Sequence, residues 1–390
     1  MICTNKFYEI YKTEPAGVAF CPYRVCPLGA HSDHQKGKVT GFAIDKGINI
    51  AYAPVPNGIV ELTSLQFEKR VIFHVNSVSK TKVGDWADYL RGATIALGKR
   101  FPLAAGLYGV IEGSLPIGGL SSSAAVIISY LSALCRVNNI SLSPQELISV
   151  ALEAENKYVG VSCGKLDQSC EALCKKDNLL YLDTLDDSYE LIPKSASAKP
   201  FEIMILFSGI ERSLAGSKFN MRVDECKSAA YALKAFSGME YGKYEDTCLR
   251  DVPYETYLAY RDKLPENWRR RAEHFYTEFN RVNAGAEAWR NGDIDSFGKL
   301  VFESGNSSIY NYETGSAELK ALYTLMKETD GVYGGRFSGA GFRGCCMGLI
   351  DPAFEESIKQ TITKKYVKQF PGLAGNFNIY FCQTADGVNF

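Results

Sequence analysis

The sequence contains no long apolar segment. Its longest helix-like apolar run, residues 124–134, falls well short of the ~20 residues that cross a bilayer. The first residues, MICTNKFYEIYK, also lack the basic stretch and apolar core of a secretion signal. We therefore expect a cytoplasmic protein that no membrane segment anchors.

Charge of one sign is not in excess either. The 390 residues include 43 basic and 44 acidic side chains, which gives a formal net charge of -1. Without a net positive field, neither nucleic acid nor an anionic membrane is expected as a partner. The one dense basic run, residues 268–271 (WRRR), is interpreted as the solvated start of a helix rather than as an anion-binding patch.

Metal-ligating patterns are also scarce. The twelve cysteines are scattered, and those at 163, 170 and 174 lack C-x-x-C spacing, so we expect reduced thiols and no structural zinc. Residues 29–37, GAHSDHQKG, bring His31, Asp33 and His34 together, which leaves a metal-dependent hydrolase as one hypothesis. His74 and His274 are the only other histidines, and neither extends this cluster.

What is present is a mixture of helical and strand patterns around an ample core. Apolar residues make up 46% and charged residues 22%, as in folded globular proteins. The composition predicts a strand pair over 39–52 and strands over 58–64, 70–75, 108–114, 201–207, 345–350 and 378–382. Apolar periodicity predicts helices over 85–97, 164–175, 270–292 and 294–303. The interleaving indicates an α/β or α+β fold. The length favours two domains, and the motifs place them at 1–190 and 191–390.

Residues 119–125, GLSSSAA, form the strongest functional signal. Glycine followed by three hydroxyls at a helix start offers unpaired backbone N–H groups, the positive end of the helix dipole and side-chain donors to one anion. An ordinary serine-capped helix is the alternative. A second cluster, residues 334–344, has five glycines in eleven positions and could instead be a tight turn. Two such loops together favour a phosphate cradle.

A carboxylate stands on an apolar helix stripe. Ser143, Pro144 and Glu146 form a helix start with a serine N-cap and a capping box. The helix that follows would align Ile148, Leu152, Glu155 and Val159 on one face. Because an unpaired buried Glu is rare, Glu155 is expected to have a partner or a ligand.

Three motifs in order resemble the galactokinase branch of the GHMP kinases. They are PYRVCPLGAHSDH at 22–34, GLSSSAA at 119–125 and GRFSGAGFRGC at 335–345. Within that branch, the first and last motifs resemble those of the galacturonokinases, which phosphorylate galacturonic acid. The resemblance spans nearly the whole chain. It implies a two-domain α+β fold with the active site between the domains, and an ATP-dependent sugar 1-kinase, expected to be a monomer with a dimer left open.

The resemblance also implies roles for single residues. Arg24 and Asp167 match the catalytic pair, for which a structural salt bridge is the alternative. Ser123 and Glu155 match the ligands of Mg²⁺, an ion that prefers few protein oxygens together with phosphate and water. Trp86 matches an aromatic residue beside adenine, although a core tryptophan has the same spacing. The remaining ATP-binding positions are Gly118, Gly119, Leu120, Ser121, Ser122, Ser123, Ala124, Gly339 and Gly341.

Sugar-facing positions differ from those of galactokinases. The positions matched are Ala30, His31, Asp33, His34, Gly164 and Phe219. Galactokinases place Glu at the position of Ala30, against the sugar's C6 hydroxyl. In galacturonate C6 is a carboxylate, and two like charges ~4 Å apart would repel by about 1 kcal/mol in water and by several kcal/mol in a drier pocket. Ala30 removes that repulsion, and His34, Lys36 or Arg343 could supply positive charge.

Other differences from the galactokinase pattern affect the identity of the substrate more than the type of reaction. Phe219 replaces a tyrosine, and the turn between Pro116 and Gly119 is one residue shorter than usual. A histidine expected within 303–308 is absent. Galacturonate is therefore favoured and galactose is the alternative. A non-catalytic sugar sensor is a distant third hypothesis, because such proteins lose part of GLSSSAA and this chain keeps all of it.

Overall fold

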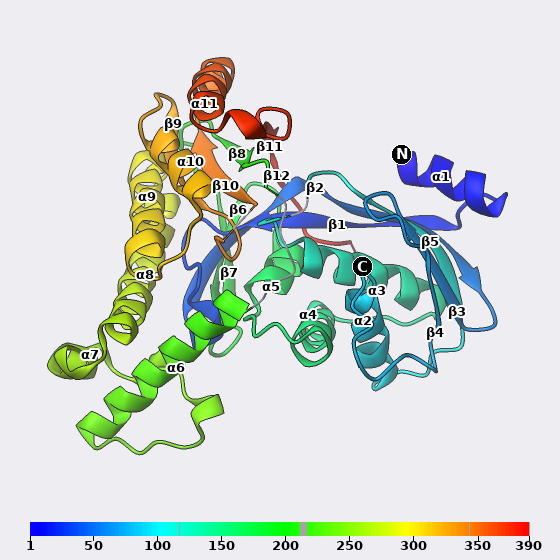
Figure 1. Ribbon diagram of the computed structural model, residues 1–390, viewed down its shortest axis with the longest axis horizontal. Helices are drawn as coiled ribbons and strands as arrows, with labels where there is room; N and C mark the ends of the chain where they lie inside the picture. The colour runs from blue at the N-terminus through cyan, green and yellow to red at the C-terminus, as the bar shows by residue number, and fades with distance from the viewer. Residues whose placement is uncertain (117, 211–216, 343, 390) are drawn as a thin grey trace.

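Two antiparallel-rich sheets with helices packed against them build the computed structural model (Figure 1), which describes residues 1–116, 118–210, 217–342 and 344–389. The first sheet has the strand order β4-β3-β5-β2-β6-β7, with β1 and β12 also paired to β2. The second has the order β11-β8-β10-β9. The α+β architecture expected from the sequence is confirmed.

The first sheet is organised around one long strand, β2 (Lys38–Val55). It pairs with β5 at one end and with β6 at the other. We predicted a strand pair here, but the chain continues straight through Gly47, where a side chain would collide with the backbone of β1. The other strands are β1 (Gly17–Val25), β3 (Ile59–Ser64), β4 (Val71–His74), β5 (Gly106–Gly113), β6 (Asn178–Asp183), β7 (Tyr189–Pro193) and β12 (Thr384–Ala385).

Four helices cover one face of this sheet, and α1 (Ile2–Tyr11) lies on the other (Figure 1). They are α2 (Asp88–Gly98), α3 (Ser122–Val137), α4 (Pro144–Glu153) and α5 (Leu166–Leu173). The apolar run at 124–134 lies in α3, which is buried on nearly all sides, as an apolar helix inside a core must be. No helix within the described residues is long and apolar enough to cross a membrane.

The second sheet consists of β8 (Glu202–Phe207), β9 (Val332–Phe337), β10 (Cys345–Ile350) and β11 (Asn378–Cys382). Its helices are α6 (Ser217–Ser237), α7 (Tyr254–Tyr260), α8 (Glu266–Arg290), α9 (Ile294–Tyr310), α10 (Ala317–Lys327) and α11 (Glu355–Gln369). Short helical turns complete the chain at Asp33–Gln35, Ala154–Val159, Tyr244–Asp246, Leu249–Asp251, Arg261–Lys263, Pro352–Phe354 and Pro371–Leu373. Strand β12 pairs with β2, so the C-terminal end joins the first sheet, and the boundary at residue 190 stays a prediction.

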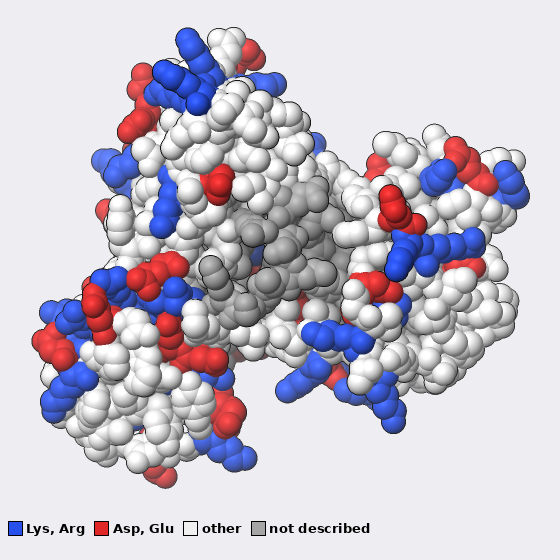
Figure 2. All heavy atoms as spheres, in the orientation of Figure 1, with Lys and Arg blue, Asp and Glu red and all other residues white. Residues whose placement is uncertain are grey.

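The basic run at 268–271 is not wholly solvated, contrary to our interpretation. Arg271 is fully buried and pairs with Glu225 at 2.6 Å and with Glu313 at 2.5 Å. These bonds tie α8 to α6 and to the turn after α9. Elsewhere, basic and acidic side chains are interspersed on the face shown in Figure 2, as the near-zero net charge predicts.

Candidate active site

A cavity of about 420 Å³ is lined by residues of both halves of the chain, including most of the predicted site. The predicted residues that line it are Arg24, Ala30, His31, Asp33, Gly119, Ser121, Ser122, Ser123, Glu155, Gly164, Asp167, Phe219 and Gly339. Those that do not are His34, Trp86, Gly118, Leu120, Ala124 and Gly341. Predicted residues as far apart in the chain as Arg24 and Gly339 therefore share one cavity.

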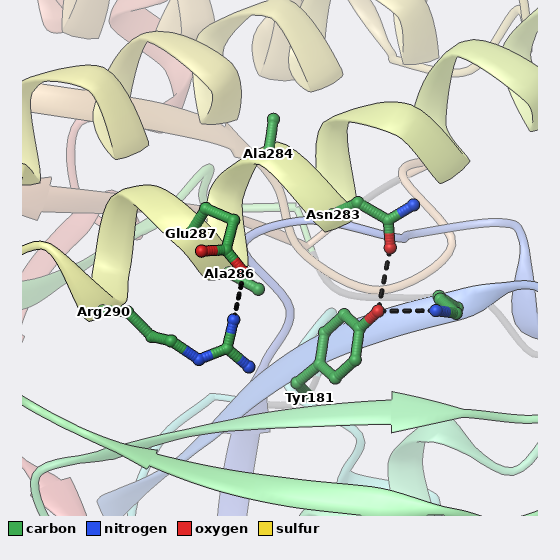
Figure 3. Close-up of a pocket in the computed structure, with 7 residues that line it drawn as sticks. Tyr181, Asn283, Ala284, Ala286, Glu287 and Arg290 are labelled. Atoms are coloured by element: carbon green, nitrogen blue, oxygen red, sulfur yellow. Dashed lines mark hydrogen bonds and ion pairs between the residues drawn. The ribbon is translucent and has the colours of Figure 1, made fainter.

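A second cavity, of about 550 Å³, lies between α8 and the strands β2 and β6 (Figure 3). The Tyr181 hydroxyl accepts a hydrogen bond from Lys38 Nζ at 2.7 Å and donates one to Asn283 Oδ1 at 2.8 Å. Arg290 pairs with Glu287 within the cavity and with Glu190. Because its polar groups satisfy one another and none belongs to the predicted site, this cavity is not the candidate.

The two glycine clusters meet backbone to backbone. A Cβ atom on Gly339 would lie 2.9 Å from Gly119 Cα, and one on Gly344 would lie 2.6 Å from the carbonyl carbon of Gly118. The Ser338 hydroxyl also donates to the Gly119 carbonyl at 2.6 Å. The close approach explains the glycines physically, since a side chain at either loop would push the other away.

Helix α3 opens into the cavity at its N-terminus. Its N-cap residue, Ser121, has a left-handed backbone (φ 64°) and makes no side-chain capping bond. The Ser121 hydroxyl oxygen is buried and has no partner among the described residues. Ser122 and Ser123 follow on the cavity wall. The N–H groups of a helix N-terminus, the helix dipole and the Ser121 hydroxyl together favour an anion here.

Arg24 and Asp167 form an ion pair in the cavity wall. Arg24 Nε and Nη2 both contact Asp167 Oδ1, at 2.8 and 2.7 Å, and Arg24 Nη1 donates to the Gly119 carbonyl at 3.3 Å. Burial alone would lower the pKa of Arg24, but the Asp167 carboxylate raises it above its usual value. The Arg24 side chain is 4% exposed and that of Asp167 23% exposed, so the carboxylate is the partner that a ligand can reach.

Asp33 lies in a short helical turn, Asp33–Gln35, and also lines the cavity. Its Oδ2 accepts from the Leu166 N–H at 3.3 Å, and burial, assisted by the charge of Asp167, raises its pKa to about 6. A Cβ atom on Gly164 would lie 2.5 Å from the Asp33 carboxyl carbon. Gly164 is therefore needed for space beside Asp33.

Glu155 lies in a π-helical turn, Ala154–Val159, that follows α4. The buried side chains here are Leu147, Val150, Ala151, Ala154 and Glu155, which have the spacing of one α-helical face. The residues predicted at 148, 152 and 159 are only half-buried, so the predicted stripe is wrong except at Glu155. The Glu155 carboxylate is buried, and its Oε2 accepts from Gln168 Nε2 at 2.9 Å. Like Ser123, it offers a hard oxygen donor to the cavity.

His31 and His34 occupy different places. The His31 ring stacks on Tyr312 with 4.3 Å between centroids, and its buried Nε2 has no partner in the part of the chain that the structure describes. His34 is outside the cavity lining, and its ring nitrogens lie 3.0 Å from Gln35 Nε2 and 2.9 Å from the Tyr312 hydroxyl. Burial lowers the pKa of His34 to about 3, so this ring supplies no positive charge. Arg343 lies outside the described residues.

The metal hypothesis for GAHSDHQKG receives no support. In the described ranges, no group of three or more His, Cys, Asp or Glu side chains is arranged to hold a metal ion. The Trp86 indole, outside the cavity lining, donates to the Lys69 carbonyl at 2.9 Å and stacks on Phe67. Its contact with adenine stays a prediction.

The turn after α9 forms a cavity wall that is not among the predicted site residues. Gly315 and Ser316 line the cavity, and Tyr312 lies behind His31. The signal was the Ser316 N-cap of α10, which accepts from the Leu319 N–H, directly after a glycine. Cys163 was also missed. It lines the cavity and is half-buried, whereas the other eleven cysteines are buried.

A helix N-terminus and two contacting glycine loops, beside an arginine–carboxylate pair, define an enzyme that handles a phosphorylated ligand between two α+β lobes. Family models for "GHMP kinases N terminal domain" and "GHMP kinases C terminal" match residues 78–175 and 286–368, and the "Galactokinase galactose-binding signature" matches residues 5–54. The chain belongs to the GHMP kinase family, which confirms the resemblance found in the sequence.

Two curated relatives and one solved structure are similar over nearly the full length. The galacturonokinase of Arabidopsis thaliana is 39% identical, over 95% of this chain and 92% of its own. The galactokinase of Roseiflexus sp. (strain RS-1) is 31% identical, over 98% and 95%. The crystal structure of Lactococcus lactis galactokinase complexed with galactose has a TM-score of 0.89 and 26% identity, over 99% and 98%. Family membership confirms that the protein is a kinase with ATP as co-substrate.

Proposed function

We propose that the protein transfers the γ-phosphate of ATP to the anomeric hydroxyl of galacturonic acid. The observation that carries the substrate choice is Ala30, which lines the cavity three residues before Asp33 and adds no negative charge there. The similarity to a galacturonokinase supports the same choice. Galactose is the alternative substrate, supported by the galactokinases among the relatives.

In this proposal, each group that lines the cavity has a part in the transfer. The α3 N-terminus and the two glycine loops would hold the triphosphate through backbone N–H groups. Asp167 would accept the proton of the anomeric hydroxyl or orient that hydroxyl, while Arg24 offsets negative charge beside it. Asp33 would accept hydrogen bonds from ring hydroxyls. Catalysis would then rest on positioning and on electrostatic stabilisation of an in-line transfer.

Mg²⁺ fits this site through oxygen donors. Ser123 and Glu155 both line the cavity, and the buried Glu155 carboxylate is a suitable ligand beside the predicted phosphate cradle. When bound, the ion would neutralise charge on the phosphate oxygens. Gln168 would orient Glu155 through the bond to its Oε2.

A sugar panel in one coupled ADP-release assay tests the proposal. We expect faster turnover with galacturonate than with galactose, and loss of turnover by a factor of about 10²–10⁴ in Asp167→Asn. Equal or better turnover with galactose would overturn the substrate choice. Sugar binding without ADP release would favour the sensor hypothesis.

A further inference from the structure

The peptide between Gly29 and His31 is held from behind by two side chains of α8. Glu278 Oε1 accepts a hydrogen bond from the Gly29 N–H at 2.7 Å, and His274 Nε2 lies 2.9 Å from the Ala30 carbonyl oxygen. Residues four apart lie on the same face of a helix, so one face of α8 supplies both contacts. The backbone of the predicted sugar loop is thus anchored by the C-terminal half of the chain.

The hydrogen-bond partners determine the tautomer of His274. A backbone carbonyl can only accept, so Nε2 must carry the proton that is donated to Ala30. His274 Nδ1 is then an acceptor, and the Ser307 hydroxyl, 2.9 Å away, must donate to it. The Asn311 side-chain amide in turn donates to Ser307 Oγ at 3.1 Å. Donation runs in one direction from α9 through His274 to the loop, an arrangement in which each bond strengthens the next.

These groups are closed off from water. His274 is fully buried and Ser307 is buried, and burial lowers the pKa of His274 to about 4, which keeps the ring neutral. Water is therefore poorly placed to replace a lost bond to the Ala30 carbonyl. The residues that follow Ala30 are His31 and Asp33, which line the cavity.

We propose that His274, oriented by Ser307, is a positioning residue for the sugar: it fixes the Ala30 carbonyl and, through the backbone, the sugar-facing His31 and Asp33. The inference rests on the proposed function in treating this side of the cavity as the sugar site. Loss of the Ser307 hydroxyl weakens sugar binding and leaves nucleotide binding unchanged, because within the described residues this hydroxyl contacts His274 and Asn311 and neither glycine loop.

Ser307→Ala is the variant that tests the positioning role of His274, with Ser132→Ala as the matched control. Ser132 is also a buried helical serine, but its hydroxyl donates only within α3, to the Ile128 carbonyl. In the free protein, we expect Ser307→Ala to speed hydrogen–deuterium exchange in peptides covering 29–34 and not in those covering 118–125. We also expect about fivefold weaker galacturonate binding by calorimetry without nucleotide, with the KM for ATP unchanged.

The exchange and binding measurements distinguish failure of the positioning role from failure of the proposed function. Exchange and sugar affinity equal to those of Ser132→Ala would overturn the positioning role, even if the wild-type protein is an active kinase. Equal weakening of sugar and ATP binding would also overturn it, since it would indicate a general loss of structure. Failure of the proposed function would appear instead in the wild-type protein, as turnover with galactose equal to or better than that with galacturonate, or as no ADP release with any sugar.

His274→Gln gives a second, independent measurement. Its side chain can still donate but is not fixed by Ser307 in the imidazole geometry, so the loop should again exchange faster and bind sugar more weakly. In wild-type protein labelled with ¹⁵N-histidine, the His274 signals should be those of a neutral ring with the proton on Nε2. A ring protonated on Nδ1 at pH 7 would contradict the proposed chain of donors.

Discussion

At the scale of single residues, Ala30 bears on the choice of substrate because its side chain carries no negative charge. It is buried in the cavity wall, and its carbonyl is held by His274. A glutamate here would stand beside the sugar's C6 group if the sugar binds as proposed. Two negative charges at ~4 Å would repel by about 1 kcal/mol in water and by more in a dry cavity. In the proposed function, Ala30 therefore favours galacturonate by avoiding this charge repulsion.

The substitution Ala30→Glu should therefore lower the ratio of kcat/KM for galacturonate to that for galactose at least fivefold, because about 1 kcal/mol corresponds to this factor. Ala30→Gln, of similar size and no charge, separates bulk from charge. Kinetics on both sugars measure the effect. If Glu and Gln change the ratio alike, steric exclusion rather than charge sets the preference.

Asp33 should make sugar binding depend on pH. Burial raises its pKa from 3.8 to about 6, and the carboxylate form is the one that accepts hydroxyl hydrogen bonds. Sugar KM should therefore rise as the pH falls below about 6, by up to about tenfold per pH unit, while the KM for ATP stays flat. A flat sugar KM from pH 5 to 8 would contradict this role.

The same shift has the opposite sign for stability. Between about pH 4 and 6 the native protein keeps a proton on Asp33 that the unfolded chain releases. Its contribution to the free energy of unfolding therefore decreases as the pH rises through this window. Sugar binding is thus expected to need the ionised form of Asp33, whereas the protonated form contributes more to the free energy of unfolding.

Single residues were predictable where a motif carried them. Arg24, Asp167, Ser123 and Glu155 were all placed on the cavity wall by spacing and resemblance. His34 belongs to the same motif as His31, yet its ring nitrogens contact Gln35 and Tyr312 instead of the cavity. The sequence cannot reveal this, because the contact with Tyr312 joins positions 278 residues apart.

At the scale of elements, the decisive contact is that between the two glycine loops. Gly339 has a left-handed backbone (φ 67°), and its α-carbon hydrogen faces the Gly119 backbone. An added methyl group there meets both backbone strain, at about 1–2 kcal/mol, and a steric clash.

Gly339→Ala should therefore lower the melting temperature and raise the KM for ATP more than that for sugar. Gly372→Ala is the matched control, because a Cβ atom there has open space around it and no left-handed backbone to strain. Calorimetry and steady-state kinetics provide the measurements. A Gly339→Ala protein with wild-type KM for ATP would show that the loops need not meet this closely.

Element boundaries were harder to predict than element types. The helices and strands around 85–97, 201–207 and 345–350 follow from local apolar patterns, and each is present. The π-helical turn at Ala154–Val159 is not visible in such a pattern. The choice of face was wrong too: Ile148 and Leu152 are half-buried, whereas the buried face of α4 carries Leu147, Val150 and Ala151, because apolar side chains stand on both faces of this segment.

At the scale of the whole molecule, the C-terminal segment contacts the end of α5, the helix that carries Asp167. The Gly387 and Val388 N–H groups donate to the carbonyls of Cys174 and Glu171, both at 2.7 Å, at the end of α5. Carbonyls at a helix end have no partner within the helix, so this segment satisfies them. The sequence offers no sign of this contact, because the two segments lie more than 200 positions apart.

Side chains of the same segment allow the contact to be weakened without deletion. Thr384 Oγ1 accepts from the Asp177 N–H at 3.0 Å, and Asp386 Oδ1 accepts from the Lys176 N–H at 2.8 Å. Thr384 Oγ1 also donates to Asp177 Oδ1 at 3.0 Å. In Thr384→Ala/Asp386→Ala, we expect the melting temperature to fall by roughly 2–4 °C, from the loss of about three hydrogen bonds. We also expect kcat to fall more than KM changes, because the far end of the Asp167 helix loses its support.

Ser357→Ala, which removes an exposed hydroxyl on α11, is the control. A lower melting temperature with unchanged kcat would show that the segment stabilises the fold without positioning Asp167.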